Sequence, residues 1–532
     1  MKTLVQFIVM FVVLIQLFPH VGYGIHSSSS VNIVSFGAKA DDRTVNTAAI
    51  QRAIDSCYSL GGGTVVVPSG IFLTGTVELK SNVDLYLERG AVLKGSPSLS
   101  DYRPYQSPTF SSPSTYGIIF AKQAVNVSIT GLGTIDGNET VFFDWTKAKA
   151  IEWSGVQLTR QGKNYRAVKS GIGDGPVVPK DRPRQMVIFS QCKNVQLRGI
   201  QLNRSPFWTL HFADCDGVLA DGLTIHASMD TPNSDGIDIT SSSNVIISNC
   251  DIRTGDDAIA ITGYSHHFEL PGYDDLKHTS ENISITGCNL QSRSSGIRIG
   301  WLDQNSVRNI VIANINITNS NRGIGIFVRD EGSIENVSIS QVNIETRLHT
   351  GDWWGNGEPI HLSAVRGTAV GKLGHIRNIS FRDITASGES GILLYGSKES
   401  IIEDVRFDNV LSIIKDSPLN EVAGGNIDLR GCFGDRQLFA SDIPAFYAQY
   451  VSRLTVMNSQ FTWDGNIRQR YFTHGIQVNN FTDVSLINNT AEASPSNRPM
   501  LPVSISNGTG LRSTFDQQQI KIERVTNIIK KK

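Results

Sequence analysis

The sequence predicts an all-β solenoid in which short strands recur from one coil to the next, with a single helix at the N-terminal end. Two observations lead to this fold class. Four segments of the same form, with isoleucines at alternate positions, occupy residues 234–239, 256–261, 294–299 and 321–326. They recur at steps of roughly 25–30 residues without long helices between them, and such repetition is typical of stacked β-coils.

The helix is predicted over residues 47–58, where small and apolar residues recur on one face. These residues are Ala49, Ile50, Ala53, Ile54 and Cys57. The run Gly61-Gly62-Gly63 follows and is typical of a helix C-terminus. Because the first coil of a solenoid exposes unpaired strand edges, we expect this helix to cover that end.

The first 24 residues have the form of a secretory signal peptide. Lys2 precedes an apolar run over residues 4–18, and small residues follow near Gly22. No later stretch is long and apolar enough to cross a bilayer. We therefore expect residues 25–532 to be one secreted, monomeric solenoid domain of the extracellular space or cell wall, with its most regular coils at about 186–430.

Charge and cysteine content exclude some functions. Lys and Arg number 48 against 49 Asp and Glu, so the chain carries no overall basic charge for nucleic acid. Cys250 and Cys288 take the same place in successive repeats, which favours buried thiols over disulfides.

Asparagines at the coil starts predict a hydrogen-bonded ladder at residues 194, 244, 282, 309, 336 and 378. Residues 142–184 break the repeat and predict a long loop that contacts substrate.

The strand register brings three aspartates together. Asp235 and Asp257 fall in the same column of successive coils, about 4.8 Å apart, and Asp256 is adjacent. Alternation sends Asp238, Ala260, Arg298 and Gly325 outward, but it would turn Asp235 and Asp257 inward unless the chain bends before Gly236 and Ala258. With that bend, Asp256 diverges from the Asp235–Asp257 pair. One acid apart from a water-holding pair, at about 6.5–9.5 Å, is the arrangement of an inverting glycosidase.

Three motifs resemble the polygalacturonase family, glycoside hydrolase family 28. They are Asn233-Ser-Asp235-Gly, Gly255-Asp256-Asp257, and the opening from Phe36-Gly-Ala to Gly61-Gly-Gly-Thr-Val-Val-Val-Pro-Ser-Gly. The likeness runs from about residue 32 to at least 429. It implies a right-handed parallel β-helix and inverting hydrolysis of pectic polysaccharide without cofactor or metal. By the same resemblance, Asp256 is the general acid, and Asp235 and Asp257 activate the water.

Two family motifs are absent. The Gly-His-Gly motif reads Ser294-Ser295-Gly296 here, and the Arg-Ile-Lys motif aligns with Gly325-Ile326-Phe327. The histidine and the two cations that engage a galacturonate carboxylate are therefore missing. Arg298, Arg322 and Arg329 are the candidate replacements, because a guanidinium suits carboxylate recognition, although surface salt bridges explain them equally well. These losses favour a rhamnogalacturonan or a modified galacturonan as the substrate.

The segment 349–361 supplies further candidates for sugar binding. Trp353 and Trp354 on a glycine-rich loop suit stacking against sugar rings, and Glu358 and His361 suit hydrogen bonds to hydroxyls. Glu358 also aligns near the aspartate column, which makes it a reserve acid. Buried tryptophans in a packed loop are the structural alternative for this segment.

Two other functions stay open at this stage. Aspartate clusters bind calcium and an arginine can act as a base, so a calcium-dependent polysaccharide lyase fits the same residues. The two lost motifs also suit a catalytically silent carbohydrate-binding β-helix. Retention of all three aspartates speaks against the silent protein, because a binding surface does not need clustered like charges.

Overall fold

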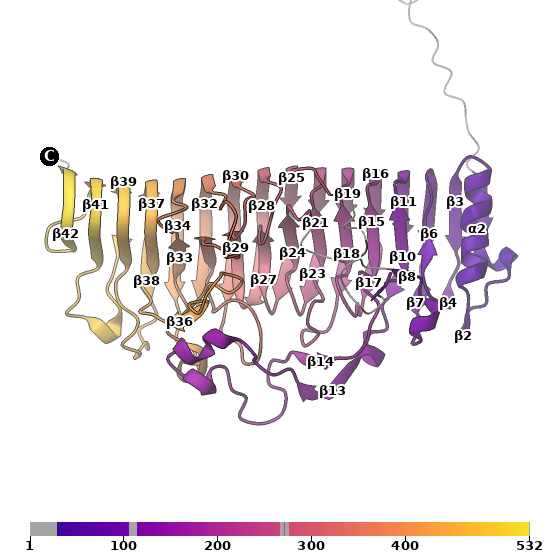
Figure 1. Cartoon of the computed structure of the whole chain (residues 1–532), viewed down its shortest axis with the longest axis horizontal. Coiled ribbons are helices and arrows are strands. Elements are labelled where there is room, and N and C mark those ends of the chain that lie inside the picture. The colour runs from indigo at the N-terminus through magenta and orange to yellow at the C-terminus, as the bar shows by residue number, and fades with distance from the viewer. Residues whose placement is uncertain (1–28, 106–113, 266–270, 272–275, 531–532) are drawn as a thin grey trace, which may run out of the picture.

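The fold is a right-handed parallel β-helix in which 36 strands form one continuous sheet system (Figure 1). The computed structural model describes residues 29–105, 114–265, 271 and 276–530. Each coil contributes strands to up to three parallel stacks. The predicted signal peptide, residues 1–24, lies outside the described residues.

The first stack has the longest strands. It contains β1 (Ser29–Asn32), β3 (Gly63–Val67), β6 (Val83–Leu87), β11 (Val125–Gly131), β16 (Lys193–Arg198), β19 (Asp216–Asp221), β22 (Ser243–Ser248), β25 (Ser280–Thr286), β28 (Val307–Ser320), β30 (Ile334–Thr346), β32 (Ile376–Gly388), β34 (Ile402–Ile414), β37 (Phe446–Met457), β39 (Ile476–Ile487), β41 (Val503–Ser513) and β42 (Ile520–Lys530). The second stack contains β2 (Asp41–Val45), β4 (Gly70–Thr74), β7 (Ala91–Gly95), β12 (Thr134–Asp136), β17 (Gln201–Asn203), β20 (Thr224–His226), β23 (Asp251–Thr254) and β26 (Asn289–Ser292), with β38 (Gln460–Trp463) and β40 (Thr490–Ala491) further along.

The third stack carries the aspartate column. It contains β5 (Val77–Glu78), β10 (Ile119–Lys122), β15 (Val187–Ser190), β18 (Leu210–Ala213), β21 (Ile237–Thr240), β24 (Ile259–Thr262), β27 (Ser295–Ile299), β29 (Arg322–Val328), β31 (Ile360–Ala364) and β33 (Ile392–Tyr395), and it continues into β37. The isoleucine columns are in register as expected, with Ile237 beside Ile259 and Ile297 beside Ile324. All four are fully buried, and each such side chain stabilises the fold by about 1.5–3 kcal/mol.

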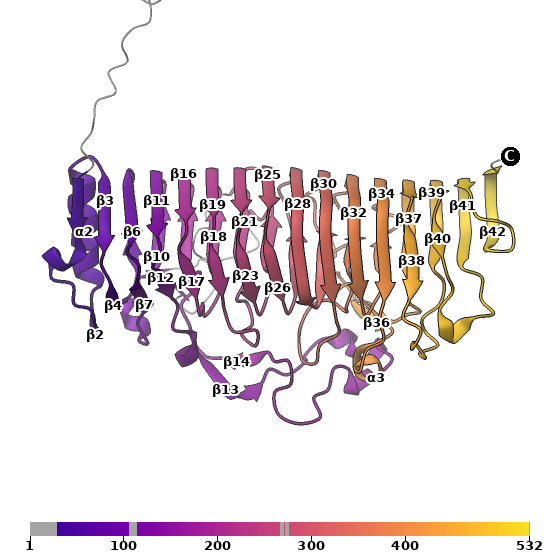
Figure 2. The same cartoon turned by 180° about the vertical axis from the view of Figure 1, so that it is seen from behind.

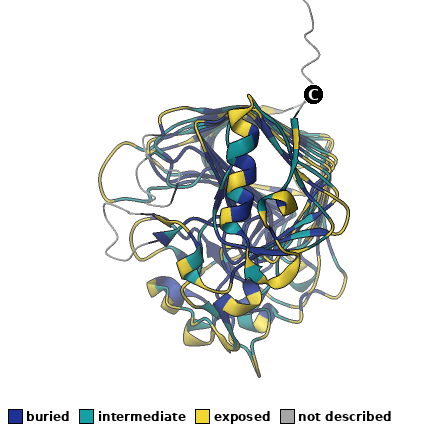
Figure 3. Cartoon of the chain, turned by 90° about the vertical axis from the view of Figure 1, so that its right-hand side faces the viewer, coloured by how far each residue is buried: buried dark blue, intermediate teal, exposed yellow. Residues whose placement is uncertain are grey.

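The predicted capping helix is present. Helix α2 (Thr47–Ser59) lies across the N-terminal end of the solenoid, with its exposed side turned outward (Figure 3). Its buried residues are the five that the sequence indicated: Ala49, Ile50, Ala53, Ile54 and Cys57. None of the described helices is both long enough and apolar enough to span a membrane.

The asparagine ladder is confirmed along the first stack. From Asn282 onward each side-chain amide donates to the preceding asparagine, as from Asn309 to Asn282 at 3.3 Å and from Asn336 to Asn309 at 3.1 Å. Before that, Asn244 donates to Asp216 and Asn194 donates to Asn126. The ladder side chains are exposed to solvent. Their backbone lies in the left-handed region, with φ of 57° at Asn282, Asn309 and Asn336, which asparagine tolerates better than most residues. The ladder therefore uses asparagine for both its backbone and its amide.

The six cysteines are free and buried, so the structure agrees with the prediction of thiols at Cys250 and Cys288. The coils also continue beyond the range expected to be most regular. Strands β37, β39, β41 and β42 pair in parallel register as far as Lys530, which ends β42.

The loop over residues 142–184, here called the strap, runs along the outside of the solenoid (Figures 1 and 2). It contains the antiparallel pair β13 (Phe143–Ala148) and β14 (Val177–Pro179). Its far end meets helix α3 (Asn420–Ala423) and the hairpin of β35 (Asn426–Asp428) and β36 (Leu438–Ala440), with the Arg166 amide donating to Val422 O at 2.7 Å. The predicted loop is thus a packed element.

Replacing Asn309 tests what the ladder contributes. Asn309→Ala removes both ladder bonds and places a Cβ residue without a polar side chain at φ of 57°. Asn309→Gly removes the same bonds but accepts that backbone freely. We expect Ala to lower the urea midpoint further than Gly, by an amount equivalent to about 1 kcal/mol. Equal midpoints, or a lower midpoint for Gly, would contradict the backbone role of asparagine.

Candidate active site

The three aspartates lie together just before strands β21 and β24 of the third stack. Asp235 precedes β21 by two residues and Asp257 precedes β24 by two, and the Gly236 amide donates to Asp257 O at 3.0 Å. One carboxylate oxygen from each of Asp235, Asp256 and Asp257 lies within 4.8 Å of the others. The register therefore brings the predicted residues into one cluster.

The expected bend before Gly236 is present, because Asp235 and Asp257 line a cleft and do not enter the isoleucine core. Close packing explains the glycines on either side of the column. A Cβ at Gly236 would lie 2.4 Å from Ala258 O, and a Cβ at Gly255 would lie 2.2 Å from Thr231 O. The bend thus requires glycine for space.

Each carboxyl group has its own surroundings. Asp256 accepts hydrogen bonds from the Asn233 amide at 3.2 Å and from the Asp257 amide at 3.0 Å. Burial, and then the charge of Asp257, nevertheless raise the pKa of Asp256 to about 7. Asp257 accepts from the Ser295 amide at 2.9 Å and from Nε of Arg298. Asp257 is therefore the carboxyl group with a cationic partner.

The carboxyl group of Asp235 lacks a hydrogen-bond donor on one of its oxygens. Its Oδ1 is buried and has no hydrogen-bond partner among the described residues. Burial, and then the charges of Asp256 and Asp238, raise the pKa of Asp235 well above its ordinary value. Burial and neighbouring charges thus favour the protonated forms of Asp256 and Asp235, beside an ion-paired Asp257.

The closest approach of the three groups is short. One oxygen of each lies within 4.8 Å of one oxygen of the others, whereas the 6.5–9.5 Å expected of an inverting enzyme separates two carboxyl groups as wholes. The separation of Asp256 from the water-holding pair stays a prediction.

The outward-facing column lies beneath other side chains and is not exposed to solvent. Asp238, Ala260, Arg298 and Gly325 point away from the core, yet Asp238 and Arg298 are only 2% and 8% exposed. Aromatic residues cover them, including Tyr264, whose hydroxyl accepts from Arg298 Nη1 at 3.3 Å. The alternation predicted the direction of these side chains correctly but not the second layer above them.

The cleft contains about 680 Å³ of empty space, part of it open to solvent, and four of its twelve lining residues are aromatic. Its lining consists of Trp208, Asn233, Asp235, Asp256, Asp257, Tyr264, Ser294, Ser295, Arg298, Trp301, Arg322 and Trp354. Sequence reasoning missed Trp208, Tyr264 and Trp301. The available signal was their position next to the aspartate column, because Trp208 lies two residues before β18 and Trp301 lies two residues after β27.

Three of the seven predicted substrate contacts line this cleft: Arg298, Arg322 and Trp354. Trp354 packs against Trp301 with ring centroids 4.6 Å apart and against Trp153 of the strap at 5.1 Å. Trp353 is 2% exposed and donates to Asp174 O of the strap at 2.9 Å. The pairing of Trp353 with Trp354 as one sugar platform is therefore wrong, because the strap buries Trp353.

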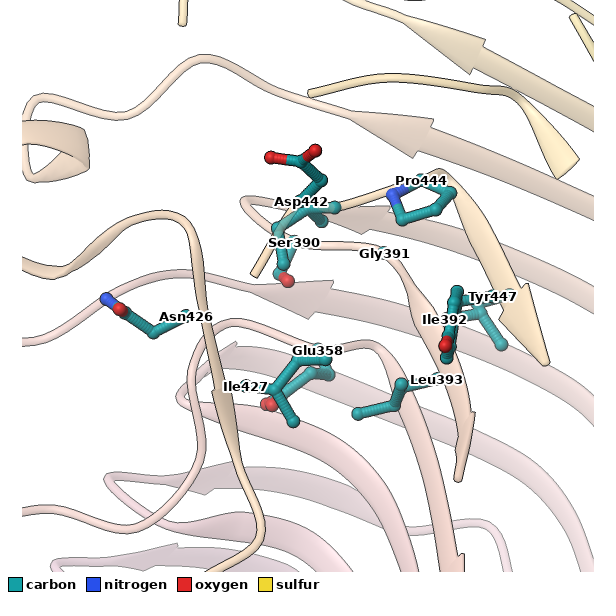
Figure 4. Close-up of a pocket in the computed structure, with 11 residues that line it drawn as sticks. Glu358, Ser390, Gly391, Ile392, Leu393, Asn426, Ile427, Asp442, Pro444 and Tyr447 are labelled. Carbon is teal, nitrogen blue, oxygen red and sulfur yellow. The ribbon is translucent and has the colours of Figure 1, made fainter. Parts of the chain in front are cut away.

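Arg329, Glu358 and His361 also lie outside the cleft lining. Arg329 is 1% exposed and donates to Ser363 O at 3.0 Å and Ser363 Oγ at 2.8 Å, which is a structural role. Glu358 faces a second, mainly apolar pocket with Ser390, Leu393 and Ile427 (Figure 4). His361 is fully buried, and its Nδ1 lies 3.7 Å from Glu358 Oε1. The structure therefore places these three residues away from the aspartate cleft, and its lining supports neither direct sugar contact by them nor Glu358 as a reserve acid.

An aromatic side chain fills the position of the lost cations. A Cβ on Gly325 would lie 2.6 Å from the ring of Phe327, so the chain has no room for a longer side chain at 325. The guanidinium groups of Arg322 and Arg329 lie 4.9 and 5.2 Å from the centre of that ring. The absent motif is thus replaced by a packed cation–π cluster.

The carboxylate cluster is a poor match for calcium. Calcium takes six to eight oxygen ligands, whereas three carboxylates converge here and Arg298 already pairs with Asp257. No other group of three or more potential metal ligands occurs in the described part of the chain. The donor set therefore does not favour the calcium-dependent lyase.

Comparison with known sequences identifies the family. The profile of the glycosyl hydrolases family 28 matches residues 57–420, and the chain belongs to this family. The exo-poly-alpha-D-galacturonosidase of Dickeya chrysanthemi is 30% identical over 255 residues, covering 43% of this chain and 41% of that protein. The endo-polygalacturonase of Pectobacterium carotovorum subsp. carotovorum is 29% identical over 246 residues, covering 43% and 54%. The chain thus spans about half the length of these relatives.

Solved structures support the fold. The polygalacturonase from Erwinia carotovora ssp. carotovora superposes with a TM-score of 0.52 at 23% identity, covering 72% of this chain and 93% of that one. The family 28 exopolygalacturonase of Yersinia enterocolitica gives 0.52 at 18% identity, covering 94% and 78%. At these identities the similarity establishes the β-helix.

Removing Arg298 tests the balance of charge in the cluster. Arg298→Gln leaves Asp257 buried among like charges without its ion pair, so we expect the free energy of unfolding to fall by about 3 kcal/mol. The matched control is Arg308→Gln, which breaks an exposed pair with Glu281 and should cost less than about 1 kcal/mol. Equal losses in the free energy of urea unfolding would show that the buried pair contributes no more to stability than the exposed pair.

Proposed function

We propose that this protein hydrolyses glycosidic bonds in a pectic polysaccharide. The observation that supports the proposal best is the cluster of three aspartates in the wall of an aromatic cleft, in a chain of glycosyl hydrolases family 28. Clustered like charges are costly for structure alone and are common at catalytic sites. The names of the two bacterial relatives describe enzymes that act on polygalacturonate, which agrees with a pectic substrate here.

The roles follow from the surroundings of each carboxyl group. Asp256, with a pKa of about 7, holds a proton to donate to the leaving oxygen. Asp257, ion-paired with Arg298, is the base that takes a proton from water. Asp235 stands beside it, with an oxygen that has no partner among the described residues, and helps to hold that water. Direct attack of this water at the anomeric carbon inverts its configuration.

The walls of the cleft suit the faces of sugar rings. Trp208, Trp301 and Trp354 offer flat apolar surface, which stacks on the C–H faces of a pyranose. Arg298 is already paired with Asp257, and the two family cations are absent, so the grip on a carboxylate at the cleavage point is weak. We therefore propose that rhamnogalacturonan or a modified galacturonan is cleaved in preference to plain homogalacturonan.

Secretion to the extracellular space or cell wall, after removal of residues 1–24, and action as a monomer belong to the same proposal. The charged start, apolar run and small residues of that segment support it.

Release of reducing ends from homogalacturonan, rhamnogalacturonan and xylogalacturonan tests this function. Hydrolysis predicts products from at least one polymer, unchanged by a chelator. Unsaturated products that disappear with chelator would instead establish a lyase. Binding without any product from these polymers or their oligomers would establish a silent carbohydrate-binding protein.

Asp256→Asn tests the assigned acid. Without the transferable proton, kcat should fall about 10²–10⁴-fold. The free energy of unfolding should change by no more than about 1 kcal/mol, because an amide of the same shape still accepts a backbone hydrogen bond. The control is Asp251→Asn, which alters a carboxylate paired with His226 outside the cleft. An Asp256→Asn enzyme that keeps most of its activity would contradict the assignment of Asp256 as the general acid.

The pH profile provides an independent check on the acid. Asp256 must be protonated to act, and its protonated fraction falls as the pH rises through about 7. We therefore expect kcat/KM to decline above about pH 7, approaching a tenfold fall per pH unit. Activity that rises between pH 7 and pH 9 would contradict a protonated Asp256 in the rate-determining step.

A further inference from the structure

Trp354 lines the aspartate cleft from a loop that has no helix or strand of its own. The loop spans residues 347–359, between β30 and β31. Its glycines Gly351, Gly355 and Gly357 have φ of 80°, 102° and 81°, a conformation that favours glycine. Since buried backbone groups outside the sheet still need hydrogen-bond partners, other segments must supply them. The place of Trp354 therefore depends on side chains outside the loop.

Arg166 of the strap supplies such partners on both sides of Trp354. Its Nη1 donates to Trp353 O, and its Nη2 donates to Gly355 O. A guanidinium is a planar fork whose donors have a fixed spacing, so one side chain holds both carbonyl groups in a fixed relation. Arg166 is 1% exposed and lies 187 residues before Trp353 in the sequence. The indole of Trp354 is thus carried between two backbone groups that the strap holds.

Arg166 is itself fixed from two directions. Its amide donates to Val422 O at 2.7 Å, and its carbonyl accepts from the Gly351 amide at 3.0 Å. The neighbouring Tyr165 donates its hydroxyl to Asn356 Oδ1 at 3.1 Å. Contacts of this kind lock the geometry of the side chain that they support.

The indole of Trp354 meets the cleft at a distance from the aspartates. It packs between Trp301 and Trp153, with ring centroids 4.6 and 5.1 Å away. Asn321 directly precedes β29, and its Nδ2 donates to Trp354 O at 2.9 Å, which places the loop beside β29. Strand β29 lies two coils, or about 10 Å, from β24, the strand that follows Asp257. A sugar ring stacked on Trp354 therefore lies away from the bond that the aspartates would cleave.

We propose that Arg166 is a positioning residue for substrate binding, which holds Trp354 in the orientation that stacks against a sugar unit of the bound chain. The inference rests on the proposed function for the identity of that chain, and it deepens the function by assigning the strap a part in recognition. Arg166 does not line the cleft, so its effect passes through Trp354. The chemical step at the aspartates should therefore be independent of Arg166.

Kinetics of Arg166→Met test this role. Met has a side chain of similar length without a donor, so both carbonyl groups lose the guanidinium. We expect KM for rhamnogalacturonan or methyl-esterified galacturonate oligomers to rise about threefold to tenfold, with kcat within about twofold of wild type. Arg166→Lys keeps the charge but lacks the fork, so it should change KM in the same direction. An unchanged KM in folded Arg166→Met or Arg166→Lys protein, whatever the melting midpoint, would assign Arg166 to structure alone and overturn the proposal.

Arg160→Met is the matched control. Arg160 also anchors the strap, because it donates to Gly425 O and Ser441 O at 2.8 Å each, and both acceptors lie outside the Trp354 loop. Its loss should lower the melting midpoint without changing KM. An equal rise in KM for Arg160→Met would show that any loosening of the strap is sufficient, which would contradict a specific role of Arg166.

Calorimetry on Asp256→Asn protein separates this inference from the proposed function, because it measures binding without turnover. The affinity for the same oligomers should fall about threefold to tenfold with Arg166→Met or with Trp354→Ala, and no further when the two are combined. Such binding without turnover by wild type would support the positioning role and contradict hydrolysis. Turnover by wild type, with losses of affinity that add in the combined variant, would support hydrolysis and overturn the positioning role. Absence of binding to any of these oligomers would overturn both.

Discussion

The register between coils is the constraint on which the site depends. Parallel stacking holds equivalent residues of neighbouring coils about 4.8 Å apart, and the isoleucine columns prevent a slip of one residue, because a slip would turn every core side chain outward. Asp235 and Asp257 are therefore held near each other whether or not their charges favour it. The solenoid imposes on the carboxyl groups a proximity that they would avoid in a flexible loop.

This proximity is stabilised locally by two means. Arg298, one coil further along the outward column, pairs with Asp257, and backbone amides of Asn233 and Ser295 donate to Asp256 and Asp257. The remaining carboxyl groups respond to burial by retaining protons, as the raised pKa values of Asp235 and Asp256 indicate. In the proposed mechanism, the carboxyl group that lies beside the cation is the base, and a carboxyl group without one is the proton donor.

The sequence was sufficient for the repetitive part of the molecule. The coils, the asparagine ladder and the aspartate cluster follow from columns that recur within the chain, and the capping helix follows from its apolar face; each agrees with the structure. The aromatic layer could not be predicted in this way. Trp208 and Trp301 lie in turns, and the burial of Trp353 depends on Asp174 in the strap, 179 residues away. Such contacts leave no periodic signal. Glu358 shows a different error, because a residue in the right column can still face another pocket.

The most direct test of the account is the source of the oxygen in the product. Digestion in ¹⁸O-labelled water, followed by mass spectrometry of the products, distinguishes hydrolysis from elimination. Unlabelled product incubated in parallel corrects for oxygen exchange. Hydrolysis by water held at the aspartates predicts one labelled oxygen at each new reducing end. Unlabelled products carrying a new double bond would contradict it, because elimination breaks the C4–O bond on the other side of the glycosidic oxygen and uses no water.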